Sequence, residues 1–142
     1  MVKKITVFTD GGARGNPGPA AAGAVIKNLA GKPRLICGKY LGHKTNNFAE
    51  YSAVLLAFET VVQQETNLNQ LEVEVFADSL LVVKQLGGEY RVKNANIRPL
   101  FEKVQELTSQ FFKVSYQHIP REKNKEADAE VNRILDENQF KD

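Results

Sequence analysis

The sequence predicts a single mixed α/β domain, in which three antiparallel strands are followed by alternating helices and strands. Runs rich in β-branched and apolar residues fill the first third of the chain, and the helical spacing of apolar residues first appears near residue 47. The 142 residues, with 42% hydrophobic and 25% charged side chains, fit one soluble globular domain with its own core. No internal repeat, low-complexity tract or linker divides residues 1–142, so they are expected to form one domain.

The N-terminal third is expected to form a meander of three strands. Residues 5–8 are a short β-branched run, and residues 20–28 and 34–41 are two further strands, joined by a turn that contains Gly31. The intervening segment, residues 11–19, is dense in glycine and proline and is expected to be irregular. The first strand is therefore expected to stop at Asp10.

The rest of the chain alternates between helical and strand patterns. The strongest helix is predicted over residues 47–64, with Asn47 as its N-cap. The remaining expected elements are a strand at 71–77, a short helix at 79–86 that Gly87 and Gly88 end, a helix at 97–110, a strand at 111–119 and a helix at 124–136 that Asn124 caps. Because the strand at 71–77 follows a long helix, it can lie parallel to the first strand through a crossover.

Composition narrows the class of protein. The one cysteine, Cys37, excludes an internal disulfide and a cysteine-based zinc site, and a reducing, cytoplasmic setting follows as the simplest expectation. No apolar run is long enough to cross a membrane, and the N-terminus turns polar too early for a secretory signal. The net charge of +2 is spread in alternating basic and acidic blocks, which permits a polyanionic partner. A monomer is the default expectation.

Four acidic residues occupy unusual positions. Asp10 and Asp78 each end an apolar strand, and the carboxyl ends of neighbouring parallel strands meet at one edge of a sheet. Glu50 and Asp128 each continue the apolar stripe of a predicted helix. Taken singly, each has a simpler interpretation, as a turn residue, a helix cap, part of a capping box with Asn47, or a first-turn acid.

As a set, the four acids indicate a metal centre. Clustered carboxylates repel one another, and a cation removes that conflict. Hard divalent ions such as Mg²⁺ prefer oxygen ligands, and the chain has no histidine or cysteine cluster that would favour zinc or copper. A centre of four carboxylates suits two ions, about 4 Å apart, acting on a phosphodiester.

Four blocks of sequence resemble type 1 ribonuclease H in order and spacing. They are T-D-G-G-A-R-G-N-P-G at 9–18, T-N-N-F-A-E at 45–50, A-D-S at 77–79 and P-R-E-K-N-K-E-A-D at 120–128. The resemblance implies a ribonuclease H-like fold, a five-stranded mixed sheet flanked by helices, and one catalytic domain. It also implies cleavage of the RNA strand of RNA–DNA hybrids, with Mg²⁺ or Mn²⁺, to leave 5′-phosphate and 3′-hydroxyl ends. The family's four metal ligands fall on Asp10, Glu50, Asp78 and Asp128.

The resemblance also assigns substrate contacts. The family's substrate-binding asparagines fall on Asn16, Asn46 and Asn47, and Thr45 matches a residue that helps to hold a DNA phosphate. Gly11 and Gly12 let the backbone come close to a nucleic acid, and asparagine amides suit base edges and the RNA 2′-hydroxyl. Helix capping is the alternative for Asn46 and Asn47, and a turn before proline is the alternative for Asn16.

Two features depart from the family pattern. A helper histidine, found in many members after the last strand, aligns with His118 if residues are counted back from Asn124, which matches a family asparagine and is itself a candidate helper. If the prolines are aligned instead, the position falls on Arg121 or Glu122, and we favour this second alignment, with Arg121 as the helper or none. Residues 87–98 lack the tryptophan- and lysine-rich protrusion of some relatives, which predicts weaker and salt-dependent binding of the hybrid.

Three other functions compete with ribonuclease H. A DNA-directed nuclease or strand-transfer enzyme would use similar acids, but the asparagine-rich contacts to a 2′-hydroxyl argue against it. A non-catalytic hybrid-binding module predicts that a carboxylate is lost, and all four are present. A structural domain, whose acids are only caps and turns, predicts no response to magnesium.

Overall fold

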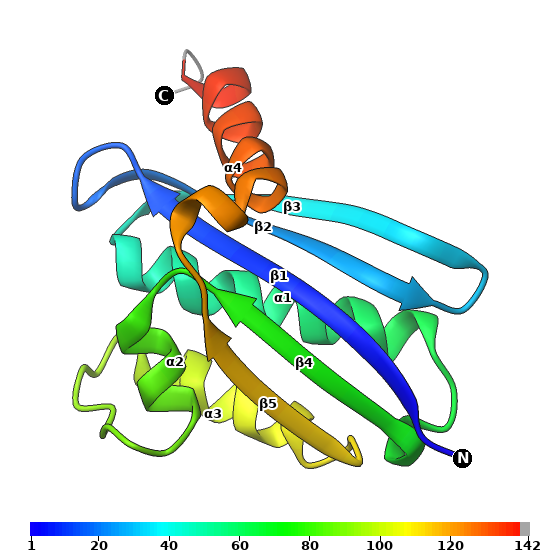
Figure 1. Ribbon diagram of the computed structural model, residues 1–142. Coiled ribbons are helices and arrows are strands. Elements are labelled where there is room, and N and C mark those ends of the chain that lie inside the picture. Colours follow the sequence, from blue (N-terminus) through cyan, green and yellow to red (C-terminus); the bar gives the residue numbers. More distant parts are fainter. Residues whose placement is uncertain (140–142) are drawn as a thin grey trace.

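A computed structural model of the protein describes residues 1–139, which form one five-stranded sheet with helices on both faces (Figure 1). The strands are β1 (Lys3–Ala13), β2 (Gly18–Leu29), β3 (Lys32–Lys44), β4 (Leu71–Ala77) and β5 (Lys113–His118). The helices are α1 (Asn46–Gln64), α2 (Leu80–Leu86), α3 (Arg98–Thr108) and α4 (Lys125–Asn138), with two 3-10 turns, η1 (Leu68–Gln70) and η2 (Arg121–Lys123).

The strand order is β3-β2-β1-β4-β5. The first three strands pair antiparallel, whereas β4 pairs parallel to β1 and β5 pairs parallel to β4. Because α1 joins β3 to β4 across one face, β4 can run beside β1 in the same direction. The predicted mixed sheet, antiparallel and then parallel, is therefore confirmed.

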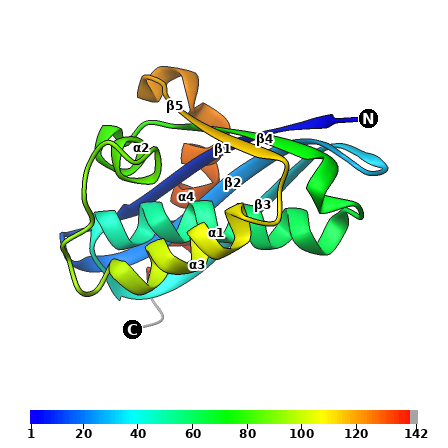
Figure 2. The ribbon, with the colours of Figure 1, turned by 90° about the horizontal axis from the view of Figure 1, so that it is seen from below.

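The helices bury two separate apolar faces. Helix α1 lies across one side of the sheet with α3 beside it (Figure 2), and its buried stripe includes Tyr51, Val54 and Phe58. Helix α4 crosses the other side, where Val131, Ile134 and Leu135 pack on a part of the sheet with small side chains. Only part of this outer side is covered by α4 (Figure 1).

The expectation that β1 stops at Asp10 is wrong. The strand continues to Ala13, because Gly11, Gly12 and Ala13 pair with the first residues of β2, and only four residues separate the two strands. Long-range pairing overrides the local turn preference of the glycines.

Gly11 also fixes the position of α1. A Cβ atom on Gly11 would lie 2.2 Å from the carbonyl carbon of Ala49 and 2.5 Å from the amide nitrogen of Glu50. Only a residue without a side chain therefore lets β1 approach the first turns of α1 this closely. This contact carries Glu50 to the end of β1.

Helix α1 begins earlier than predicted. Its N-cap is Thr45, whose hydroxyl oxygen accepts a hydrogen bond from the Phe48 amide at 3.2 Å, so the prediction of Asn47 as N-cap is wrong. Glu50 consequently lies beyond the third helical position, so the interpretation of Glu50 as part of a capping box is also wrong. Asn124 is the N-cap residue of α4 as predicted, but its side chain does not cap the helix.

No helix within residues 1–139 combines the length and apolar character needed to cross a membrane.

Candidate active site

Three of the four predicted acids converge at one edge of the sheet. Asp10 on β1, Glu50 on α1 and Asp78 directly after β4 each offer a carboxylate oxygen, and these three oxygens lie within 4.8 Å of one another. Asp10 is buried, and Glu50 and Asp78 are half-buried. The expectation that Asp10 and Asp78 lie side by side is confirmed.

The strand register explains this convergence. Thr9 of β1 pairs with Ala77, the last residue of β4, so Asp10 and Asp78, the next residue along each chain segment, lie at the same level. Helix α1 then brings Glu50 from one side, held by the close contact between Gly11 and Ala49.

Asp128 completes the group from the opposite face of the sheet. It lies in the first turn of α4 and lines the same cavity of about 400 Å³ as Asp10 and Glu50. Asp128 also raises the pKa of Asp10, through a side-chain hydrogen bond and through its charge. Asp128 is not part of the tight group of three, so the site has three closely packed acids and one peripheral acid.

Burial and mutual repulsion disfavour the charged forms of these acids. Burial, and then the charge of Asp78, raise the pKa of Asp10 to about 8. Burial raises the pKa of Glu50 to about 7, although a hydrogen bond from Ser79 and the charge of Arg121 oppose this shift.

The donor set fits a hard divalent cation. Asp78 Oδ2 is buried and has no hydrogen-bond partner within residues 1–139. An unsatisfied buried oxygen beside two further carboxylates is the environment that a cation with oxygen ligands would satisfy.

Known proteins are similar to this chain in both sequence and fold. Residues 8–134 match the family described as reverse transcriptase-like. The crystal structure of RNase H1 from the archaeon Halobacterium salinarum is 36% identical in sequence and matches with a TM-score of 0.85, over 95% of this chain and 99% of that chain. The chain belongs to the type 1 ribonuclease H family. The predicted family and the predicted ribonuclease H-like fold are thereby confirmed, and the family is one of enzymes.

Two further members of the ribonuclease H family are similar to this chain, and one of them is much longer. LC11-RNase H1, solved in complex with an RNA/DNA hybrid, is 41% identical and matches with a TM-score of 0.86 over 94% of this chain and 97% of that chain. The bifunctional protein Rv2228c of Mycobacterium tuberculosis is 37% identical over 94% of this chain. This chain spans only 36% of the length of Rv2228c, and 65% of the ribonuclease HI of Halobacterium salinarum.

The structure separates the two candidates for the ribonuclease H helper. Arg121, in η2, lines the cavity with Asp10, Glu50 and Asp128. His118 is the last residue of β5, where it pairs with Ala77 and is exposed. Arg121 therefore shares the cavity of the acids, and its role as helper stays a prediction.

The predicted substrate-binding residues connect the loop after β1 to the start of α1. Asn46 Oδ1 accepts a hydrogen bond from the Ala13 amide at 2.8 Å, and Asn16 Oδ1 accepts one from the Asn46 amide at 3.0 Å. Both oxygens are therefore engaged within the protein, which leaves the amide nitrogens of Asn16 and Asn46 to donate to a substrate. Asn46, Gly11 and Gly12 line the cavity, where Gly12 is half-buried and Gly11 is buried against α1.

Asn124 has a structural role that the sequence did not reveal. Its side chain is 1% exposed and donates a hydrogen bond through Nδ2 to the Thr9 carbonyl at 2.8 Å. Because Thr9 precedes Asp10 and Asn124 begins α4, this bond ties the helix that carries Asp128 to the strand that carries Asp10. The two residues are 115 positions apart, so no local pattern predicts the bond.

Replacing Asn124 with alanine is expected to destabilise the protein. The change leaves the buried Thr9 carbonyl without this donor, which should lower the free energy of unfolding by about 1–3 kcal/mol. Urea denaturation measures the difference. The control, Asn96→Ala at an exposed position, should change it by less than about 0.5 kcal/mol, and equal effects of the two variants would contradict the assigned role.

Proposed function

We propose that the chain is a metal-dependent endonuclease that hydrolyses the RNA strand of RNA–DNA hybrids. The observation that carries this proposal is the convergence of Asp10, Glu50 and Asp78, with Asp128 on the same cavity, in a member of the ribonuclease H family. The presence of an RNA/DNA hybrid in the structure of the 41% identical LC11-RNase H1 supports the choice of substrate.

We assign the acids to two Mg²⁺ ions, for which Mn²⁺ is the expected substitute. Asp10 would contribute to both ions, Glu50 and Asp78 to one of them, and Asp128 to the other. When bound, such ions lower the pKa of water and stabilise the charge that develops on the leaving oxygen. Hydrolysis adds water across one P–O bond. Breaking the bond to the 3′ oxygen leaves a 3′-hydroxyl on one product and a 5′-phosphate on the other.

The chain's own side chains would select RNA and orient it. Glu50 can accept a hydrogen bond from the 2′-hydroxyl. The side-chain amide nitrogens of Asn16 and Asn46, and the side-chain amide of Asn47, can contact base edges and sugars. Thr45, at the start of α1, would face a phosphate of the DNA strand. Asp128 would orient the attacking water, and Arg121 contributes positive charge beside Glu50.

The direct test compares labelled duplexes of one sequence in the presence of magnesium. We expect the RNA strand of the RNA–DNA hybrid to be cut internally, whereas the DNA–DNA duplex remains intact. The RNA–RNA duplex shows how strictly the DNA strand is required. Cutting of the DNA–DNA duplex would favour the DNA-directed nuclease instead, and binding of the hybrid without cutting would favour the binding module.

Magnesium is expected to stabilise the protein in a pH-dependent way. The ordinary pKa of Asp10 is 3.8 and its folded pKa is about 8, so the folded state binds the extra proton between these values. The contribution of Asp10 to stability is therefore complete below about pH 4 and is lost as the pH rises to about 8. Because a bound cation favours the ionised carboxylates, it should offset this loss of stability.

Thermal denaturation at two pH values measures this effect. Magnesium should raise the Tm more at about pH 8 than at about pH 5, each compared with EDTA and with potassium chloride of matched ionic strength. A Tm that magnesium leaves unchanged at both pH values would indicate that the acids are only caps and turns.

A further inference from the structure

The outer face of the sheet, on which α4 packs, carries an aromatic pair that the proposed cleavage chemistry does not use. Phe8 of β1 pairs with Phe76 of β4, and residues paired in this way share one face of the sheet. Their rings are stacked, with centroids 5.2 Å apart and an angle of 22° between the planes. Both side chains are partly exposed, because α4 does not cover this part of the face.

This pair lies directly beside the acidic site. Asp10 follows Phe8 by two residues on β1, so these two side chains belong to the same face, and Asp78 lies near Asp10 just beyond the end of β4, two residues after Phe76. The acids and the rings form neighbouring rows, about 7 Å apart along the strands. A nucleic-acid strand that continues from the acids along this face would therefore meet the rings next.

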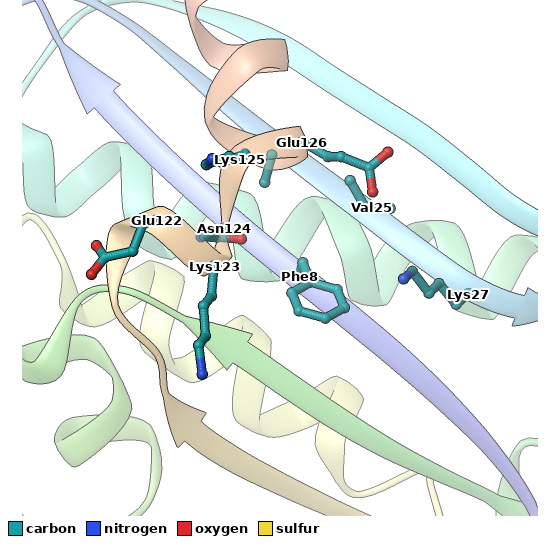
Figure 3. A pocket seen from close by; sticks show the side chains of 9 residues that line it. Phe8, Val25, Lys27, Glu122, Lys123, Asn124, Lys125 and Glu126 are labelled. Atoms are coloured by element: carbon teal, nitrogen blue, oxygen red, sulfur yellow. The ribbon is translucent and has the colours of Figure 1, made fainter.

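Two lysines flank the rings. Lys27 Nζ lies 5.2 Å from the centroid of the Phe8 ring, and Figure 3 shows Lys27 and Lys123 on either side of Phe8. Within residues 1–139, neither lysine forms an ion pair with a carboxylate. Both lysines and Phe8 line a cavity of about 270 Å³.

The acids around this cavity do not cancel its positive charge. Glu126 is paired with Arg34 at 2.9 Å. The carboxylate of Glu122 points away from Phe8 (Figure 3). The rings, with Lys27 and Lys123 free beside them, therefore combine an apolar surface with positive charge.

We infer that Phe8, Phe76, Lys27 and Lys123 bind an unpaired nucleotide of a single-stranded nucleic acid, next to the catalytic acids. The base would stack on Phe76, because Phe8 already has Phe76 stacked against it and Lys27 over its ring, and the adjoining phosphates would pair with the lysines. A single strand is the ligand that fits, because the bases of a duplex are already stacked and cannot offer a face to a ring. The inference rests on the proposed function in one respect only, namely that the bound strand continues toward the catalytic acids.

Fluorescence anisotropy in EDTA tests this site without cleavage. The probes are a labelled ten-nucleotide oligouridine, the corresponding oligothymidine, and an abasic oligomer with the same number of phosphates. We expect the two oligomers with bases to bind about fivefold or more tightly than the abasic oligomer, because stacking on a ring contributes to their binding alone.

Three variants separate stacking from charge. Phe76→Leu keeps an apolar side chain without the ring, and should weaken binding of the oligouridine about fivefold while binding of the abasic oligomer is unchanged. The double variant Lys27→Ala/Lys123→Ala should weaken binding of every probe, with a smaller dependence on salt. Lys103→Ala, at an exposed position of α3, is the matched control and should leave all affinities unchanged.

Equal binding of the oligouridine and the abasic oligomer would overturn the inference, as would competition by polyglutamate equal to that by unlabelled oligouridine. Unchanged affinities in the double lysine variant would also overturn it, even if Phe76→Leu failed to fold. Because these assays contain no metal, their result does not depend on cleavage. If the protein cuts the hybrid but does not bind single strands, the proposed function holds and only the inferred single-strand site is wrong.

Discussion

Replacing Asp10 with asparagine is expected to abolish hydrolysis of an RNA–DNA hybrid, lowering the rate by several orders of magnitude while the fold is retained. All three other acids raise the pKa of Asp10, and carboxylate oxygens of Asp10, Glu50 and Asp78 lie within 4.8 Å of one another. Loss of its charge removes a ligand from both proposed ions. Single-turnover cleavage of a labelled hybrid in magnesium measures the effect.

The same substitution should stabilise the metal-free protein. At about pH 8 the ionised Asp10 is disfavoured by burial and by the neighbouring acids, and asparagine removes that repulsion. The Tm in EDTA should therefore rise by roughly 3 °C or more. Asp136→Asn, at an exposed acid of α4 that pairs with Arg14, is the control and should leave cleavage intact. Cleavage by Asp10→Asn at the parental rate would show that the four-acid assignment is wrong.

Replacing Gly11 with alanine is expected to lower the stability of the protein more than replacing Gly12, the other glycine of the site, with alanine. The added Cβ would lie 2.2 Å from both the carbonyl carbon and the carbonyl oxygen of Ala49, so the backbone of β1 or α1 must move. We expect the free energy of unfolding to fall by about 3 kcal/mol or more. Cleavage should fall as well, because Glu50 is the next residue of α1 and moves with Ala49.

Gly12→Ala is the matched control for this experiment. Its added Cβ would meet only Val131 Cγ1, at an ordinary contact distance of 3.8 Å. Urea denaturation should therefore show a change of less than about 1 kcal/mol for Gly12→Ala. Equal losses for the two variants would mean that the close approach of β1 and α1 does not hold Glu50 in place.

Elements of the sheet and of the site were predictable from the sequence when a short-range pattern of residues identifies them. Alternation of apolar residues identified β4, and helical spacing identified α1, because each element buries one continuous face. The proximity of Asp10 and Asp78 followed from two parallel strands that each carry an acid after their apolar run. The acids could therefore be placed together without any knowledge of distances.

The errors arose where contacts between distant residues decide the structure. The glycines after Asp10 favour a turn locally, but pairing with β2 extends β1 to Ala13. Thr45 replaces Asn47 as the cap because the position of α1 is set by its packing on β1. The bond between Asn124 and Thr9 has no local signal at all, and neither has the aromatic pair of Phe8 and Phe76, which depends on the register of two strands.

A crystal of the protein soaked with Mn²⁺ would show whether the four acids bind metal, because anomalous scattering locates the ions. We expect metal ions bound by Asp10, Glu50 and Asp78, with Asp128 contributing a further ligand, at the edge of the sheet beside β1 and β4. Carboxylates that stay apart with no ion among them, or manganese bound only elsewhere on the protein, would contradict it.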